Sequence, residues 1–216
     1  MRRQLDDQLS ELNNEMIEMG ALCEEAIALA ATALSEGDIE IAAKVAPLDL
    51  RIDEKERLIE GLCTRILMQQ QPVASDLRQI TAAYKMVTDM ERIGDQAEDI
   101  AEIVVYLGGR TAEEHYNIRK MAEATIKMVT ESVDAYVKRD IELAEAVIAY
   151  DDVVDDYFET VKNNLINMIA DNPSEGSFAL DLLMIAKYFE RIGDHAVNIA
   201  EWVAYTVAGM IREKDS

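Results

Sequence analysis

Oxygen-bearing side chains recur at a fixed helical spacing in two segments of this chain. Residues 89–102 read DMERIGDQAEDIAE and residues 188–201 read YFERIGDHAVNIAE, so the core Glu-Arg-Ile-Gly-Asp returns after 99 positions. Because an α-helix turns about 100° per residue, side chains at i, i+4 and i+8 rotate by only about 40° per step and stack along one face. These residues are Glu91, Asp95 and Asp99 in the first copy and Glu190, Asp194 and Asn198 in the second.

Rows of carboxylate and amide oxygens suit hard cations. A second acidic row precedes each copy of the motif, again with i, i+4 spacing: Asp49 and Asp53 before the first, Asp151 and Asp155 before the second. If neighbouring helices turn these rows toward each other, about six to eight oxygens surround a shared groove. The pattern predicts a site for Mg²⁺, Ca²⁺, Mn²⁺ or iron, and suits zinc less because the rows lack cysteine and histidine. The identity of the metal stays open.

An ordinary solvated face is the alternative interpretation of each acidic row. Like charges at i, i+4 destabilise a helix by a few tenths of a kcal/mol, and no basic residue interrupts either row, so a cation would remove this repulsion. The row on the first motif points away from the expected apolar stripe, so we expect it outside the bundle core. The nearby acids assigned to solvated surface are Glu56, Glu60, Asp152, Asp156 and Glu159.

Four other residues of the repeated motif refine the predicted metal sites and helix packing. Asn198 keeps a carbonyl ligand but lacks the charge of Asp99, which predicts a weaker second site. His195 has no partner histidine, and we expect it at the surface or rim rather than on a metal. Gly94 and Gly193 stand within helices, where each costs about 1 kcal/mol relative to alanine, so we expect close approach of packed helices there.

The composition excludes several classes of partner. With 43 acidic and 21 basic residues, the net charge of −22 repels nucleic-acid backbones and anionic lipid. The longest nearly apolar stretch, Ala26 to Leu34, is much shorter than the roughly 20 residues of a membrane span, and the first residues carry no apolar signal core. Cys23 and Cys63 form no disulfide framework. We therefore expect a cytoplasmic protein that reaches the membrane only peripherally, through protein partners.

Apolar residues at three- and four-residue spacing, with only nine glycines and three prolines, predict an all-α protein. We expect helices over 3–35, 39–70, 75–107, 113–137, 140–171 and 176–213, with Gly108-Gly109 separating two domains, 1–108 and 109–216. Each domain is expected to be a three-helix bundle, and the two bundles are similar because the chain is a tandem repeat.

One proline distinguishes the two halves. Pro47 should kink or split the helix 39–70 just ahead of Asp49, whereas its counterpart Ala149 should leave the helix 140–171 intact. The apolar spacing also predicts a core for the first half. The expected core residues are Leu58, Leu62, Ile66, Ile80, Val87, Ile93, Ile100 and Val104.

The doubled Glu-Arg-Ile-Gly-Asp motif, with its acidic extensions and its setting in two three-helix units, resembles the PhoU family of phosphate-uptake regulators. The resemblance implies a cytoplasmic, peripheral homodimer with multinuclear metal sites at the paired acidic motifs. It also implies negative regulation of phosphate uptake and of the phosphate-starvation response. In that role the protein would contact the ATPase subunit of the phosphate ABC transporter and, where one is present, a phosphate-sensing histidine kinase.

Two further functions compete with this interpretation. Di-iron and di-manganese oxidases also hold metals with helical carboxylates, but they use Glu-x-x-His pairs inside the bundle. Neither His115 nor His195 has a glutamate three residues upstream, and no nucleophile elbow or phosphate-binding glycine loop occurs, so we do not expect an enzyme. The other alternative is a helical adaptor without metal, whose negative surface docks a basic partner.

Overall fold

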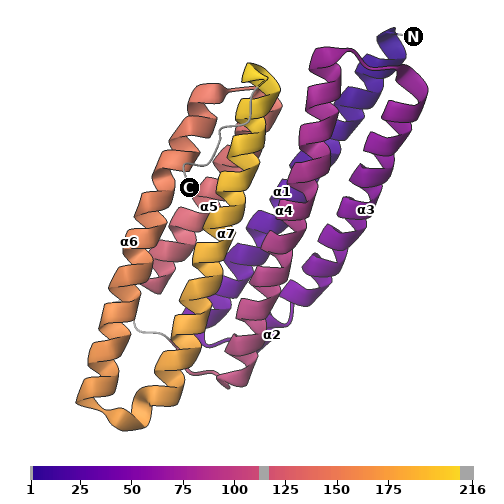
Figure 1. The fold of residues 1–216 in the computed structure, drawn as a ribbon. Helices are drawn as coiled ribbons and strands as arrows, with labels where there is room; N and C mark the ends of the chain where they lie inside the picture. Colours follow the sequence, from indigo (N-terminus) through magenta and orange to yellow (C-terminus); the bar gives the residue numbers. More distant parts are fainter. Residues whose placement is uncertain (1, 112–116, 210–216) are drawn as a thin grey trace.

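The computed structural model describes residues 2–111 and 117–209, and this part of the chain is helical without strands (Figure 1). The predicted all-α fold of two tandem three-helix bundles is confirmed. The first bundle contains α1 (Arg2–Glu36), α3 (Val45–Gln70) and α4 (Ala74–Tyr106), and the second contains α5 (Ile118–Lys138), α6 (Ile141–Asp171) and α7 (Gly176–Ala208). The helix expected over 176–213 ends at Ala208, because Gly209 takes the left-handed conformation (φ 74°). The expected helix start at 113 and His115 lie outside the described residues.

The predicted break near Pro47 is present. A four-residue helix, α2 (Ile39–Ala42), is capped by Asp38, whose Oδ1 accepts from the backbone N–H groups of Glu40 (2.8 Å) and Ile41 (3.1 Å). The chain restarts as α3 at Val45, so Pro47 lies in a first helical turn, where its missing N–H sacrifices no hydrogen bond. In the second half α6 is continuous through Ala149, as expected.

The two bundles join along α4 and α7, while α1 also packs on α5. Helices α4 and α7 run antiparallel, since Arg78 near the start of α4 donates from Nε to the carbonyl of Thr206 near the end of α7 (3.3 Å). At the other end, Arg110 follows α4, pairs with Glu175 and places its guanidinium 3.6 Å from the ring centre of Phe178. The two motif copies therefore lie near the middle of one helix–helix junction.

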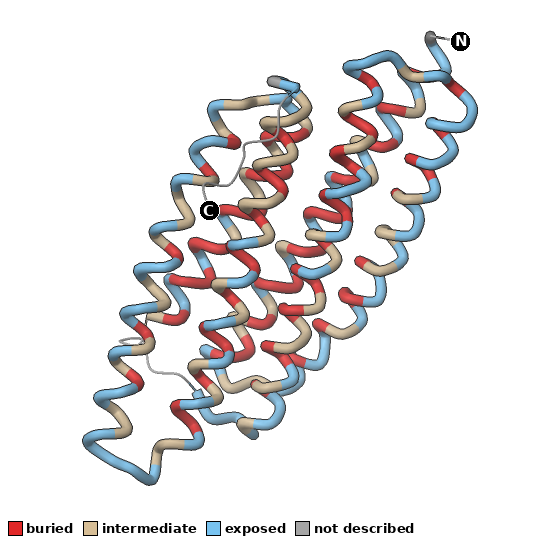
Figure 2. The backbone as a smooth tube through the Cα atoms, viewed as in Figure 1, coloured by how far each residue is buried: buried red, intermediate tan, exposed pale blue. Residues whose placement is uncertain are grey.

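Buried residues line the inner faces of both bundles (Figure 2). The expected core of the first half is confirmed except at Leu58, which is 49% exposed. The buried stripe of α3 instead follows Ile52, Ile59 and Ile66 at seven-residue spacing, and Leu58 lies about 100° away from Ile59 around the helix. No helix of the described residues is long and apolar enough to span a bilayer.

Gly94 permits the close approach of α3 and α4 that the sequence predicted. A Cβ at this position would lie 2.8 Å from Asp49 Oδ1 and 2.9 Å from Ile52 Cδ1, both atoms of buried residues. The equivalent contact at Gly193 is looser, since a Cβ there would lie 3.4 Å from Asp151 Oδ1. The first bundle therefore requires glycine, whereas the second has room for a methyl group.

We predict that Gly193→Ala and Gly94→Ala change stability in opposite directions. Alanine removes the glycine helix penalty of about 1 kcal/mol, so Gly193→Ala should raise the free energy of unfolding by up to about that amount. Gly94→Ala should lower it by about 1–3 kcal/mol, because the buried Asp49 and Ile52 must shift. Urea unfolding followed by circular dichroism measures both changes, and equal effects of the two substitutions would contradict the packing difference.

Candidate functional site: two acidic clusters

The acidic rows of the first half meet across the contact between α3 and α4. Asp49 on α3 is buried beside Gly94, and its carboxylate interacts with Glu98 and Asp95 on α4. Further along, Asp53 and Glu56 of α3 interact with Glu91 of α4. The structure thus brings the two predicted rows face to face. We call this set the first acidic cluster: Asp49, Asp53, Glu56, Glu91, Asp95 and Glu98.

Desolvation and mutual repulsion dominate the electrostatics of the first acidic cluster. Burial, followed by the charges of Glu98 and Asp95, raises the pKa of Asp49 to about 7. Burial and the charge of Asp95 also raise the pKa of Glu91, although neighbouring Arg92 opposes the shift. These carboxylates therefore favour either a bound proton or a bound cation.

Two buried oxygens of this cluster lack hydrogen bonds from any described residue. Asp49 Oδ1 has no such partner, and Glu91 Oε2 has only an ion-pair contact of 3.4 Å with Arg92. Unpaired buried carboxylate oxygens fit the requirements of an oxygen-liganded cation. Within residues 2–111 and 117–209, however, no three acidic, histidine or cysteine side chains are close enough together to hold one ion as they stand. Coordination would require the side chains to rotate inward.

The second half contains a matching but smaller set, the second acidic cluster: Asp151, Asp155, Glu190 and Asp194. Burial and the charges of Asp155, Asp194 and Glu190 raise the pKa of Asp151 to about 6. Unlike the first acidic cluster, this one contains an ammonium group, because Lys187 pairs with the buried Oε2 of Glu190. Burial still raises the pKa of Asp155, but Lys187 reduces that rise.

Asp99 and Asn198 engage the junction between α4 and α7 rather than the rows on α3 and α6. Asp99 interacts with Tyr188, and the equivalent Asn198 donates from Nδ2 to Asp89 Oδ1 (3.0 Å). Two i+4 steps rotate a side chain by about 80°, which turns the third position of each row toward the neighbouring helix. Asp99 still senses the charge of Asp95, so it lies at the margin of the first acidic cluster.

Glu98 is the residue of the first acidic cluster that the repeat analysis missed. It lies seven residues after Glu91, a separation that returns to within about 20° of the same face. The heptad spacing was therefore a usable signal. It was hidden because the second repeat has Val197 at this position, so Glu98 is absent from the shared pattern.

His195 is half-buried at the edge of the α4–α7 junction, with Nδ1 2.8 Å from Asp89 Oδ1. Asp89 thus contacts both His195 and Asn198 of the other repeat. This agrees with the expected rim position. The expectation that Glu56 is ordinary solvated surface is wrong, since it is half-buried and its pKa is raised by burial and by Glu91.

Glu60 is likewise half-buried, whereas Asp152, Asp156 and Glu159 are exposed, as expected.

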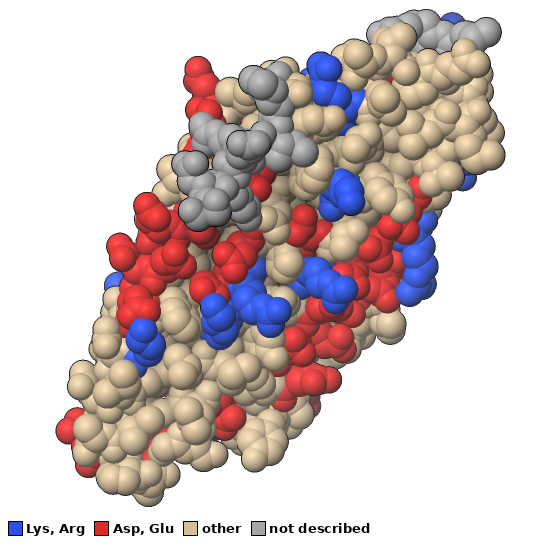
Figure 3. Space-filling model, viewed as in Figure 1, with Lys and Arg blue, Asp and Glu red and all other residues tan. Residues whose placement is uncertain are grey.

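Basic side chains reach the acidic rows from flanking faces. Arg57 pairs with Asp53 at 3.0 Å, and Arg92 pairs with Asp95 at 2.9 Å. Figure 3 shows two belts of Asp and Glu about half-way along the molecule, with Lys and Arg between them. The expectation that no basic residue interrupts the acidic rows is therefore wrong for the folded protein. The spacing of residues along one face of a helix does not show that basic side chains from adjacent positions and helices reach the same acids.

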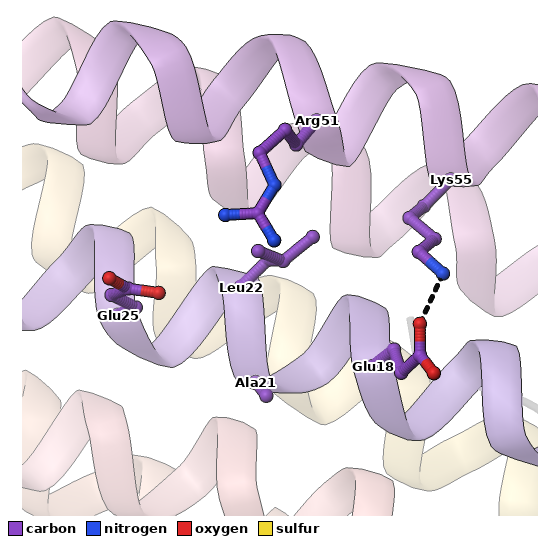
Figure 4. Close-up of a pocket in the computed structure, with 6 residues that line it drawn as sticks. All are labelled: Glu18, Ala21, Leu22, Glu25, Arg51 and Lys55. Atoms are coloured by element: carbon purple, nitrogen blue, oxygen red, sulfur yellow. Dashed lines mark hydrogen bonds and ion pairs between the residues drawn. The ribbon is translucent and has the colours of Figure 1, made fainter.

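A hollow between α1 and α3 is lined by two basic side chains. Its volume is about 300 Å³, and Arg51 extends across Leu22 while Lys55 points to Glu18 (Figure 4). Lys55 also pairs with Glu15, so two carboxylates of α1 neutralise its charge. At Lys55 the contact between α1 and α3 is therefore ion-paired.

The fold and the clusters define a tandem-repeat helical protein with one acidic cluster on each repeat. The model of the PhoU domain matches residues 16–104 and 118–203, and this chain belongs to the PhoU family. A phosphate-specific transport system accessory protein PhoU homolog from Pseudomonas aeruginosa is 36% identical over 209 residues, spanning 96% of this chain and 86% of that relative.

Solved structures agree with this assignment. The crystal structure of PhoU from Pseudomonas aeruginosa has a TM-score of 0.90 at 36% identity, covering 95% of this chain and 99% of that one. The phosphate transport system regulatory protein PhoU from Streptococcus pneumoniae has a TM-score of 0.87 at 27% identity, covering 97% and 99%. The architecture of the two repeats is thus shared with known members of the family.

We predict that Asp49 makes the metal-free protein less stable as pH rises. Its carboxyl has a pKa of about 7 in the folded state against an ordinary value of 3.8, so the folded state holds an extra proton between these values. The free energy of unfolding should therefore fall from about pH 4 to about pH 7 through this group. Asp49→Asn should remove this component and leave the variant more stable than wild type at pH 8.

Urea unfolding of chelator-treated protein at pH 4.5 and pH 8 measures the effect. Asp134→Asn is the control, because Asp134 forms an ion pair with Lys138 far from both clusters along the chain. Identical pH dependence for wild type and Asp49→Asn would show that this carboxyl titrates normally.

Proposed function

We propose that this protein is a cytoplasmic accessory protein that restrains phosphate uptake and the phosphate-starvation response. It would act as an adaptor between the ATPase subunit of the phosphate ABC transporter and a phosphate-sensing histidine kinase. Membership of the PhoU family carries this proposal, because the matched relatives are named as accessory or regulatory proteins of phosphate transport. The family resemblance also favours a homodimer.

A binding role fits the site better than an enzymatic one. The acidic clusters lie on the outer sides of the bundles, between α3 and α4 and between α6 and α7, rather than within the apolar cores. The Glu-x-x-His arrangement of helical oxidases is missing at His195, which instead contacts Asp89. Helix faces and fixed charge are the features available for protein partners.

We further propose that the acidic clusters hold divalent or trivalent metal ions, in multinuclear form. The unpaired Oδ1 of Asp49 and the raised pKa of its carboxyl support this assignment in the first acidic cluster. A bound cation would supply positive charge that cancels the repulsion and ties α3 to α4. The ligands in the first cluster would be Asp49, Asp53, Glu91 and Asp95, joined by Glu98, with Asp99 at the margin. Those in the second would be Asp151, Asp155, Glu190 and Asp194, with Asn198 at the junction.

The two clusters should differ in affinity. The second lacks the carboxylate of Glu98, because Val197 replaces it. Cations pair with both clusters, Arg57 and Arg92 with the first and Lys187 with the second. A weaker second site was expected from Asn198, and Val197 adds a second physical reason, since it removes a carboxylate.

A helical adaptor without metal is the second candidate. It is favoured by one observation: in the described part of the chain, no three ligating side chains yet converge on one point. Proton uptake and the ion pairs of Arg57, Arg92 and Lys187 would then reduce the repulsion. Metal content decides between the two forms of the adaptor.

We predict that Mn²⁺ or Fe²⁺ stabilises the wild-type protein and that Asp95→Ala with Asp194→Ala abolishes the effect. At a concentration 100 times Kd, binding to the folded state alone adds about 2.7 kcal/mol to stability. Without metal, the double variant should be as stable as wild type or more so, because it removes repelling charges. Elemental analysis and thermal melting with and without chelator measure both parts.

The matched control is Glu11→Ala with Glu123→Ala, which removes the same charge from exposed positions on α1 and α5. This control should keep the metal-dependent rise in Tm. If wild type and the Asp95/Asp194 variant melt at the same temperature with metal, and neither retains metal, the metal proposal fails and the metal-free adaptor remains.

The adaptor role itself predicts that cells lacking this protein import too much phosphate. Uptake of labelled phosphate in phosphate-rich medium should rise several-fold on deletion of the gene and return to normal on complementation. Pull-down of tagged protein from membranes should recover the transporter ATPase. Unchanged uptake after deletion would overturn the proposed function, whatever the metal content.

A further inference from the structure

A surface groove lies beside the break between α2 and α3, against the last turns of α4. It encloses about 340 Å³. Helix α2 packs on α4 at the end of the first bundle, which gives the groove two helical walls (Figure 1). The walls consist of small and apolar side chains with acids on the α4 side: Ala42, Ala43, Ala46, Ala101, Val105, Glu98 and Glu102.

In the first repeat the groove combines a broken helix with small lining residues. In the second repeat α6 is unbroken, and Ile148 stands at the position of Ala46. Ile148 is partly buried and packs against the hydrophobic core. The two repeats therefore share their architecture but differ in side-chain bulk at this position.

Exposed apolar side chains extend the surface around the groove. Val105 in its wall is 48% exposed, and Tyr106 beside it is 78% exposed. Leu50, one helical turn beyond Ala46, is 64% exposed, and Ile39 at the start of α2 is also exposed. Covering these groups would remove apolar area from water, which favours association. The surface thus has the apolar centre typical of an interface.

We propose that this groove docks a short amphipathic, basic helix of a partner protein. An aliphatic side chain of that helix would enter the alanine-lined hollow, and its Lys or Arg residues would lie against Glu102. The groove is lined by no basic residue, and the net charge of −22 opposes nucleic acid and anionic lipid as occupants. The inference rests on the proposed adaptor function and assigns its partner-binding surface.

A synthetic fluorescein-labelled helical peptide with a leucine stripe and flanking lysines is the probe. Fluorescence anisotropy should show that Ala46→Ile weakens its binding at least tenfold, because the larger side chain, which the second repeat carries as Ile148, would occupy the hollow. Ala149→Ile adds the same bulk at an exposed position of α6 and should bind like wild type. Circular dichroism checks that each variant is folded.

Charge is tested with Glu102→Lys against Glu142→Lys, which makes the same change at an exposed site on α6. Only Glu102→Lys should weaken binding several-fold. Absence of binding by wild type, equal binding by wild type and Ala46→Ile, or equal loss in both lysine variants would overturn the proposal. A change from dimer to monomer in Ala46→Ile, seen by analytical ultracentrifugation, would identify a second copy as the occupant and also overturn it.

These outcomes are separable from failure of the proposed function. Phosphate uptake after gene deletion tests the adaptor role and does not involve the groove. If deletion raises uptake while Ala46→Ile leaves peptide binding intact, the adaptor role stands and the groove assignment fails.

Discussion

Repulsion between desolvated carboxylates along the contact of α3 with α4 is the constraint on which the rest of the structure depends. The apolar stripes of these helices bring Asp49 against Gly94 and under the charges of Asp95 and Glu98. Hydrophobic packing of the buried stripes holds the two helices together, so the unfavourable charges are tolerated rather than required by the fold. A protein retains such a cost where a proton, a cation or a partner is bound.

At the junction between α4 and α7, repulsion between carboxylates is avoided in a different way. There groups of one repeat face groups of the other: Tyr188 interacts with Asp99, while Asn198 and His195 contact Asp89. Because the helices run antiparallel, equivalent positions of the repeats meet as partners. At the junction the carboxylates therefore face tyrosine, asparagine and histidine, whereas in the outer clusters carboxylate faces carboxylate.

Periodicity predicted most of the fold because it reports burial directly. The helix break at Pro47 followed from the missing N–H, and the facing acidic rows followed from i, i+4 spacing on successive helices. Leu58 was misplaced because two apolar neighbours, Leu58 and Ile59, compete for one stripe and sequence alone does not fix the rotation of α3. Single-residue orientation is the limit of such reasoning.

The candidate site was predicted less completely. Glu98 was missed because the second repeat has valine there, and Asp99 and Asn198 turned toward α4–α7 because rotation accumulates along each row. Contacts from other faces and helices, such as Arg57 with Asp53, depend on side-chain rotamers and on helix placement. These are tertiary properties, and spacing within one helix carries no information about them.

The break between α2 and α3 also makes the two ends of the molecule structurally different. A chain built from two alike repeats around an antiparallel junction presents nearly equivalent ends, and a ligand that recognised only the common architecture would bind in two orientations. One interrupted helix makes the ends different. An assembly formed at that end has one partner molecule per chain and a single orientation, so internal duplication does not impose a doubled stoichiometry.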